Sequence, residues 1–333
     1  MELAIQVGGG QVRRDKTGIE AIVEQARLAE DLGFRVVFVP DHYVFESLGV
    51  LQKDIPAYEM SFVMATLAQR TRTIRIGSHV ACVLFRHPAM LARLFAQIDE
   101  ASGGRLLAGV GAGWTKAEFE MMGIDFPPPS VRLEMLDETV EILFGLWTRE
   151  TFTFEGKHYR LREAVCLPKP AQKPRPPLML GGSGKGILAR AGRYADIVHM
   201  VPTLGTAGTT TLEEVRKFTD RAVTSKLARV REAEEKAGRP KGSVRFATTI
   251  FQYTMTSSPA ETKRLAEELS GVFGLSPGEL LQHPVSLLGT AEEMVDELRR
   301  REETHGLSLL AINFTEDSQI RTFGEKVLPK VSS

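Results

Sequence analysis

Short, uninterrupted apolar segments recur along the whole length of this chain, and most are followed by a longer stretch with helical spacing. Continuous apolar runs, unlike runs that alternate with polar residues, are typical of parallel strands that helices cover. Eight such runs occur, at residues 3–7, 36–39, 74–78, 106–110, 178–181, 197–200, 244–251 and 309–312. Eight strands joined by helical crossovers predict an α/β fold, a (β/α)8 TIM barrel with insertions, and leave an open doubly wound sheet as the alternative.

The segments between these strands carry the apolar stripes of amphipathic helices, for example at Leu133 and Val140. Thr290 and Glu293 have the spacing of a capping box that begins a helix near the C-terminus. Barrels of this size routinely form one domain, so we expect residues 1–333 to be a single domain.

Two stretches interrupt the simple repeat of strand and helix. Residues 151–161 alternate and turn at Glu155-Gly156, which predicts a hairpin, and a proline-rich segment then leads into the fifth strand. Residues 202–211 are a small polar loop that precedes a strongly charged helix. We therefore expect insertions near 151–177 and 202–240.

Composition argues against several classes of function. Lys and Arg number 42, as do Asp and Glu, so the chain has no basic surplus for nucleic acid. The two cysteines are too few for a disulfide scaffold and predict buried thiols in a reducing cytoplasm. The seven histidines show no metal-ligand spacing, and the chain has neither a signal peptide nor a run of about 18 apolar residues. We expect a cytoplasmic protein with a small-molecule substrate, without metal, nucleic-acid or membrane partner, and leave a homodimer open.

In such barrels the chemistry lies where strands end and the following loops begin. Asp41 and His42 follow the second strand, where an acid and an imidazole can anchor a cofactor and transfer a proton. A loop turn capped by Asp41 is an equal alternative. His79 and Val80 follow the third strand beside Gly77, whose missing side chain admits a flat ligand or simply allows a kink.

The fourth and fifth strands end in clusters of glycine. Gly111 and Gly113 leave room for a large group and precede Trp114, which can wall a pocket, but their spacing is not that of a dinucleotide fold. The cluster after the fifth strand directly precedes a helix, whose first amides and dipole favour an anion. We expect a phosphate site there, with a plain tight turn as the alternative, at Gly181, Gly182, Ser183 and Gly184.

Taken together, these stretches resemble the luciferase-like flavin and deazaflavin barrel superfamily, and within it the F420-dependent oxidoreductases. The resemblance covers nearly the whole chain in the same order. The matching segments are VFVPDH, TIRIGSHV, FRHPAMLARLFAQIDEASGGRLLAGVGAGW, EFEMMGIDFPP, LPKPAQKPRPPLMLGGSGKGIL and LLGTAEEMVDEL. Of these, ASGGR and the proline-rich approach to LGG are specific, whereas the glycine clusters alone are not.

The resemblance implies a bound cofactor, coenzyme F420, with FMN as the alternative. It places the cofactor ring against Asp41 and His42, and in hydride-transferring members this histidine exchanges a proton. A non-prolyl cis peptide that backs the ring corresponds to His79-Val80. The remaining cofactor contacts that it implies are Gly111 and Gly113 on the ribityl side, and the amides of residues 181–184 at the phosphate.

This chain departs from the glucose-6-phosphate dehydrogenases of that family at two places. Those enzymes have a glutamate after the glycines of the fourth strand, where this chain has Trp114, and a tryptophan soon after the Asp-His pair, where Phe45 and Glu46 stand nearby. We therefore do not transfer the sugar-phosphate substrate. A larger, flatter or more apolar substrate is expected, in a pocket lined by Phe45 and Trp114.

The expected reaction is hydride transfer between F420 and an organic substrate, with His42 as proton donor or acceptor. The first alternative is an FMN-dependent luciferase-like monooxygenase that uses reduced flavin and oxygen. The second is a non-catalytic protein that only binds flavin or F420, against which the intact Asp41–His42 pair argues.

Overall fold

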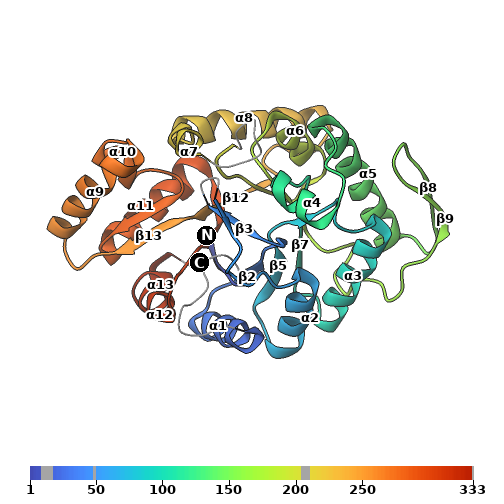
Figure 1. Cartoon of the computed structure of the whole chain (residues 1–333), viewed down its shortest axis with the longest axis horizontal. Coiled ribbons are helices and arrows are strands. Elements are labelled where there is room, and N and C mark those ends of the chain that lie inside the picture. The colour runs from blue at the N-terminus through green and yellow to red at the C-terminus, as the bar shows by residue number, and fades with distance from the viewer. Residues whose placement is uncertain (9–17, 48–49, 204–210, 332–333) are drawn as a thin grey trace.

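The chain forms a closed barrel of parallel strands surrounded by helices (Figure 1). The computed structural model describes residues 1–8, 18–47, 50–203 and 211–331. Each barrel strand pairs in parallel with its neighbours, and the ring closes because β1 pairs with β15 and β7 with β10. The barrel strands are β1 (Glu2–Gln6), β2 (Val36–Val39), β5 (Arg75–Ser78), β7 (Leu106–Gly111), β10 (Leu178–Gly181), β11 (Ile197–His199), β12 (Arg245–Ile250) and β15 (Leu307–Ile312). The predicted (β/α)8 TIM barrel is confirmed.

Helices cover the outside of the barrel. The predicted capping box is present, because Thr290 accepts the amide of Glu293 and Glu293 accepts the amide of Thr290. The helices are α1 (Ile19–Leu32), α2 (Met60–Arg70), α3 (Pro88–Ala101), α4 (Lys116–Met122), α5 (Pro129–Thr148), α6 (Lys185–Tyr194), α7 (Leu212–Lys217), α8 (Asp220–Lys236), α9 (Pro259–Phe273), α10 (Pro277–Leu281), α11 (Ala291–His305), α12 (Asp317–Lys326) and α13 (Leu328–Val331). Within the described ranges, none of them combines the length and the apolar character that crossing a membrane requires.

Side chains fill the inside of the barrel. One buried cluster consists only of barrel-strand residues, among them Phe38, Leu107 and Met179, and therefore occupies the interior. The opposite faces of the strands pack against the helices in a larger core. Because the interior is packed, a ligand site must lie at an end of the barrel.

Two excursions lie at opposite edges of the molecule in Figure 1. At one edge is the predicted hairpin, in which β8 (Phe152–Glu155) pairs antiparallel with β9 (Arg160–Ala164). At the other, β13 (Gln252–Met255) and β14 (Ser286–Gly289) pair in parallel around α9 and α10. This second excursion was not predicted, because the apolar run of β12 continues into β13 with one residue between them.

Shorter excursions follow individual barrel strands. After β2, the strands β3 (Phe45–Ser47) and β4 (Val50–Gln52) pair antiparallel, and after β5 the short β6 (Ala81–Cys82) pairs with the end of β7. Between β11 and β12 the chain forms α7 and α8, and α8 packs along α6 in the outer ring. Most of the polar loop expected at 202–211 lies outside the described residues.

Candidate active site

A cavity of about 1190 Å³ lies at the carboxyl ends of the barrel strands. The residues that the sequence predicted for the site follow four different strands, and all of them line this cavity. They are Asp41, His42, Phe45, His79, Val80, Gly111, Gly113, Trp114, Gly181, Gly182, Ser183 and Gly184. The barrel thus gathers into one place side chains that the sequence separates by up to 143 positions.

His42 is held by a buried carboxylate. Its Nδ1 lies 2.9 Å from Oε2 of Glu118, a side chain that is only 2% exposed. The other oxygen, Oε1, accepts the amides of Tyr43 at 2.6 Å and Val44 at 3.2 Å. One carboxylate therefore orients both the imidazole and the loop that carries it, and Nε2 is the ring nitrogen left to exchange a proton in the cavity.

Asp41 holds the same loop to the neighbouring strand. Arg86 donates to both of its oxygens, at 2.7 and 2.9 Å, and the amide of Cys82 donates to Oδ2 at 2.8 Å. Since protein donors occupy both oxygens, the carboxylate shapes the cavity by fixing the positions of the segments after β2 and β5.

The peptide bond between His79 and Val80 is cis, as the resemblance implied. The side chain of Val80 occupies space that neighbouring glycines leave open. A Cβ on Gly111 would lie 2.7 Å from Val80 Cγ2, and one on Gly181 would lie 2.9 Å from the same side chain. Glycine is therefore required at the ends of the fourth and fifth barrel strands, β7 and β10, because the side chain of Val80 approaches their backbones closely.

The imidazole of His79, the residue that precedes the cis bond, is paired with a second histidine. His79 Nδ1 lies 2.8 Å from Oε1 of Gln6, and its Nε2 lies 3.0 Å from Nε2 of His199. Burial, with a smaller contribution from His42, lowers the pKa of His79 to about 4, and burial also lowers the pKa of His199 well below its usual value. Both rings are neutral near pH 7, so this part of the cavity carries no charge.

Two aromatic rings flank His42. The ring of Trp114 stands edge-on to the imidazole at a centroid distance of 5.6 Å, and that of Phe45 lies 5.9 Å away. The two predicted pocket residues thus adjoin the predicted proton-transfer residue. We call this part of the cavity, defined by His42, Phe45 and Trp114, the aromatic end.

The predicted phosphate site leads directly into α6. Its N-cap residue, Gly184, makes no side-chain cap, and the first amides of a helix have no intrahelical acceptor. The amide of Gly182, however, donates to the carbonyl of His199 at 2.9 Å. The expectation that residues 181–184 present all their amides is therefore corrected, because sheet pairing takes this one.

A buried cation also lines the cavity. Arg132, near the start of α5, is 9% exposed, and within the described part of the chain its Nε and Nη1 have no hydrogen-bond partner. A Cβ on Gly186 would lie 2.5 Å from Leu133, so the starts of α5 and α6 are in contact. The guanidinium lies over the ring of Phe126, 3.8 Å from its centroid, and this contact leaves its N–H donors available to an anion. We call this region, defined by Arg132 and the first turn of α6, the anion end.

Lys226 reaches the anion end from α8. Its Nζ donates to the carbonyl of Ser183 and to the hydroxyl of Thr203, each at 2.9 Å. The hydroxyl of Ser183 in turn donates to the carbonyl of Val201. These bonds fix the backbone that precedes the helix.

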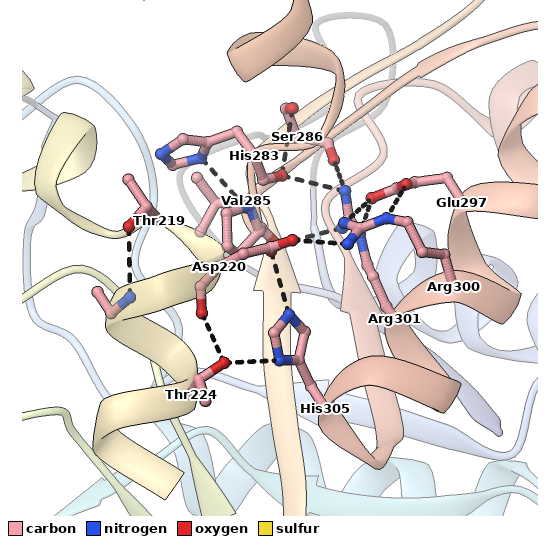
Figure 2. Close-up of polar contacts among 12 residues, drawn as sticks. Thr219, Asp220, Thr224, His283, Val285, Ser286, Glu297, Arg300, Arg301 and His305 are labelled. Carbon is pink, nitrogen blue, oxygen red and sulfur yellow. Dashed lines mark hydrogen bonds and ion pairs between the residues drawn. The ribbon is translucent and has the colours of Figure 1, made fainter.

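A polar network joins the start of α8 to α11 and to His283 before β14 (Figure 2). His283 Nε2 donates to the carbonyl of Val215, which lines the cavity, at 2.9 Å. At the start of α8, Asp220 lies 2.6 Å from Arg300 and 3.2 Å from His305 (Figure 2). Burial raises the pKa of Asp220, but its contacts with His305 and Arg300 outweigh this and hold the pKa at about 2. The carboxylate is therefore ionised and ties α8 to α11.

The side chains of the site that were not predicted include Arg86, Glu118, Arg132, His199 and Lys226. Arg86, Glu118 and His199 act through partners far away in the sequence, so no local pattern reveals them; Glu118, for example, is 76 positions from His42. Arg132 alone carries a local signal, because a cation in the first turn of a helix opposes the helix dipole. Within the described residues, no cluster of His, Cys, Asp and Glu is arranged to hold a metal.

Comparison with known proteins relates this site to enzymes. The family model described as luciferase-like monooxygenase matches residues 2–323. An F420-dependent glucose-6-phosphate dehydrogenase of Intrasporangium calvum is 30% identical over 283 residues, which cover 79% of this chain and 81% of that protein. An FMNH2-dependent dimethylsulfone monooxygenase of Pseudomonas putida is 36% identical over 109 residues, 33% of this chain and 30% of that protein. The solved structure of an F420-dependent secondary alcohol dehydrogenase, in complex with an F420-acetone adduct, matches with a TM-score of 0.77 at 22% identity, covering 100% of this chain and 99% of its own, a likeness of fold.

Proposed function

We propose that this chain, which belongs to the luciferase-like monooxygenase family, is an oxidoreductase that binds coenzyme F420 and transfers a hydride between it and a small organic substrate. The F420-dependent relative aligns over 79% of this chain, whereas the FMNH2-dependent relative aligns over 33%. This difference in coverage supports F420 over FMN.

The observation that carries the proposal is that the cavity combines an anion end with a protonatable side chain. The unpaired nitrogens of Arg132 and the first amides of α6 fit the phosphate that both F420 and FMN carry next to the ribityl chain. His42 and the cis peptide at His79-Val80 line the same cavity. The residues present therefore fit a phosphate-bearing cofactor.

The protein contributes orientation and proton transfer. When bound, the deazaflavin supplies the hydride chemistry. Nε2 of His42 gives a proton to the substrate oxygen or takes one from it, while Glu118 holds the ring through Nδ1. The neutral pair His79 and His199 neither repels the cofactor ring nor competes with His42 for the proton.

A monooxygenase that uses reduced FMN and oxygen is the second candidate. The local identity of 36% with the dimethylsulfone monooxygenase favours it, and the same anion end would hold the phosphate of FMN. A protein that only binds the cofactor would have no use for the His42–Glu118 contact, so we place that reading last.

Titration of the cofactor-free protein with F420 and, separately, with FMN tests the proposal. Cofactor fluorescence reports binding in both experiments. We expect saturable binding of F420 and weaker binding of FMN. Tight binding of FMN with no binding of F420 would overturn the proposal in favour of the monooxygenase.

A further inference from the structure

We propose that α7 is a gate in the wall of the cavity, which turns about Phe218 to admit the cofactor and is held closed by a catch on the β13–β14 excursion. The catch is defined by the side chain of His283 and the carbonyl of Phe273, which both bind α7. This inference rests on the proposed function for the ligand, a flavin or deazaflavin, and adds the route by which that ligand enters and leaves.

The helix α7 forms part of the cavity wall but buries none of its own side chains. Leu212 and Val215 line the cavity, and both are only partly buried. The helices α6 and α8, by contrast, each bury apolar side chains in the core. Since few apolar contacts are lost when α7 moves, a local opening of α7 costs less free energy than an opening of α6 or α8.

Two hydrogen bonds hold α7 to the excursion. One is donated to α7, by Nε2 of His283 to the carbonyl of Val215 at 2.9 Å. The other is donated by α7, from Nε of Arg216 to the carbonyl of Phe273. Neither His283 nor Arg216 lines the cavity, so both bonds lie behind the wall. Breaking them would release α7 without removing a side chain that faces the ligand.

The catch itself is firmly held. Arg301 of α11 is 2% exposed and donates to the carbonyls of His283 at 3.0 Å and Ser286 at 2.7 Å, while Glu297 fixes its guanidinium at 2.7 Å (Figure 2). Burial lowers the pKa of His283, so its ring is neutral near pH 7 and donates through Nε2 alone. An opening therefore moves α7 and leaves the excursion in place.

The chain can bend between α7 and α8. Phe218 separates the two helices and is 1% exposed, so it anchors this point in the core. Thr219 gives α8 a cap of its own, because its hydroxyl accepts the amide of Ala222 at 3.3 Å (Figure 2). Since α8 begins with its own cap, α7 can turn while α8 stays in position.

Hydrogen–deuterium exchange of the cofactor-free, full-length protein tests whether α7 opens independently. We expect the amides of α7 to exchange much faster than those of α8. Two changes weaken the catch: Arg216→Met removes a donor at an exposed position, and His283→Phe keeps a ring without a donor. Each should raise exchange in α7 roughly 2- to 10-fold, as expected for loss of one hydrogen bond, and leave α8 and α11 unchanged.

Stopped-flow fluorescence with F420 and, separately, with FMN tests whether this opening admits the ligand. A gate must open for entry and for release. In Arg216→Met, the association and dissociation rate constants should therefore both rise roughly 2- to 10-fold, while Kd stays within about twofold. A residue that only supports a wall contact would change the dissociation rate constant alone.

The matched control is Arg264→Met. Arg264 is 71% exposed, lies on α9 of the same excursion and pairs with Glu268 on its own helix. This change should leave exchange and both rate constants unaltered. His283→Gln, which can still donate to Val215, should bring the rate constants of His283→Phe back toward those of the unaltered protein.

Two results would overturn the gate. One is exchange in α7 that is as slow as in α8, and the other is an association rate constant that stays the same in Arg216→Met and His283→Phe. Failure of both cofactors to bind would overturn the proposed function instead, and exchange in the cofactor-free protein would still decide whether α7 opens.

Discussion

The two ends of the cavity are built from different parts of the chain. The anion end rests on the regular barrel, where β10 leads into α6 and the start of α5 packs against it. The aromatic end comes from the excursions after β2 and β7. At the anion end, Nε and Nη1 of Arg132 have no hydrogen-bond partner among the described residues, whereas Lys116, which also lines the cavity, is paired with Glu120.

This difference separates cofactor binding from substrate selection. Elements that take part in the barrel's hydrogen bonding cannot shift without disturbing their neighbours, so they suit a ligand with a defined phosphate. Excursions can differ in length and side chains while the barrel stays intact. Changes at the aromatic end should therefore alter chemistry and substrate, and changes at the anion end should alter cofactor affinity.

The largest effect is expected for His42→Asn, which removes the proton donor and keeps a side chain of similar reach. Turnover of an organic substrate with F420 should fall about 10²- to 10⁴-fold, as for loss of a general acid or base. The affinity for F420 should change only a few-fold. Stopped-flow absorbance of the cofactor and fluorescence titration measure the two quantities.

The matched control is His87→Asn, since His87 is an exposed N-cap residue and asparagine is an equally good cap. It should leave both quantities unchanged. Full activity of His42→Asn across the pH range would show that this histidine only packs in the cavity. It would contradict the assignment of proton transfer to the aromatic end and cofactor binding to the anion end.

For Arg132→Gln we expect a smaller effect, which falls on the affinity for F420 and not on turnover. A hydrogen bond to a charged group contributes about 1.5–3 kcal/mol, so affinity for F420 should fall roughly 10- to 100-fold. Turnover at saturating F420 should stay within a few-fold. Because Nε and Nη1 make no hydrogen bond in the free protein and only the contact with Phe126 is lost, the melting temperature without cofactor should change little.

The control for this change is Arg72→Gln, at a cation that is 78% exposed and pairs with Glu30 and Asp31 on the outside of the barrel. It should bind F420 like the unaltered protein. If Arg132→Gln did the same, the phosphate would have to be held by α6 alone or lie elsewhere.

The smallest effect is expected for Asp220→Asn, which weakens the network between α8 and α11 (Figure 2). The folded pKa of about 2 lies below the unfolded value near 3.9, so the carboxylate stabilises the protein above pH 4 and loses this effect as pH falls toward 2. Allowing for partial exposure, we expect a loss of about 1–2 kcal/mol at pH 7.

Thermal melts of Asp220→Asn and the unaltered protein between pH 7 and pH 3 measure this loss. The gap in melting temperature should narrow below pH 4, while F420 affinity holds. A constant gap across that range would show that the charge of Asp220 is not what ties α8 to α11.

The barrel, the β8–β9 hairpin and the capping box at Thr290 were predictable because each depends on residues close together in the sequence. Apolar runs, turn residues and cap spacing are local signals. The β13–β14 excursion was missed for the same reason. Its first strand follows β12 after a single residue, and the separation is visible only because Gln252 pairs with Ser286 instead of with β15.

The positions of the candidate residues were predictable as well, since the carboxyl ends of parallel strands in a barrel all face one side. What each residue does there was not. The carboxylate of Asp41 accepts hydrogen bonds from Arg86. Gly111 and Gly181 leave room for the side chain of Val80, and the amide of Gly182 donates to the carbonyl of His199 in the sheet.

Periodicity and strand ends thus place a set of residues at one end of a barrel from the sequence alone, because the direction of a parallel strand determines which residues reach that end. Only the folded chain decides that Glu118 orients His42, that two nitrogens of Arg132 have no hydrogen-bond partner among the described residues, and that Phe45 and Trp114 meet at the imidazole. These outcomes depend on which loops cross and how closely helices pack, and such distances are determined by tertiary contacts between residues tens of positions apart.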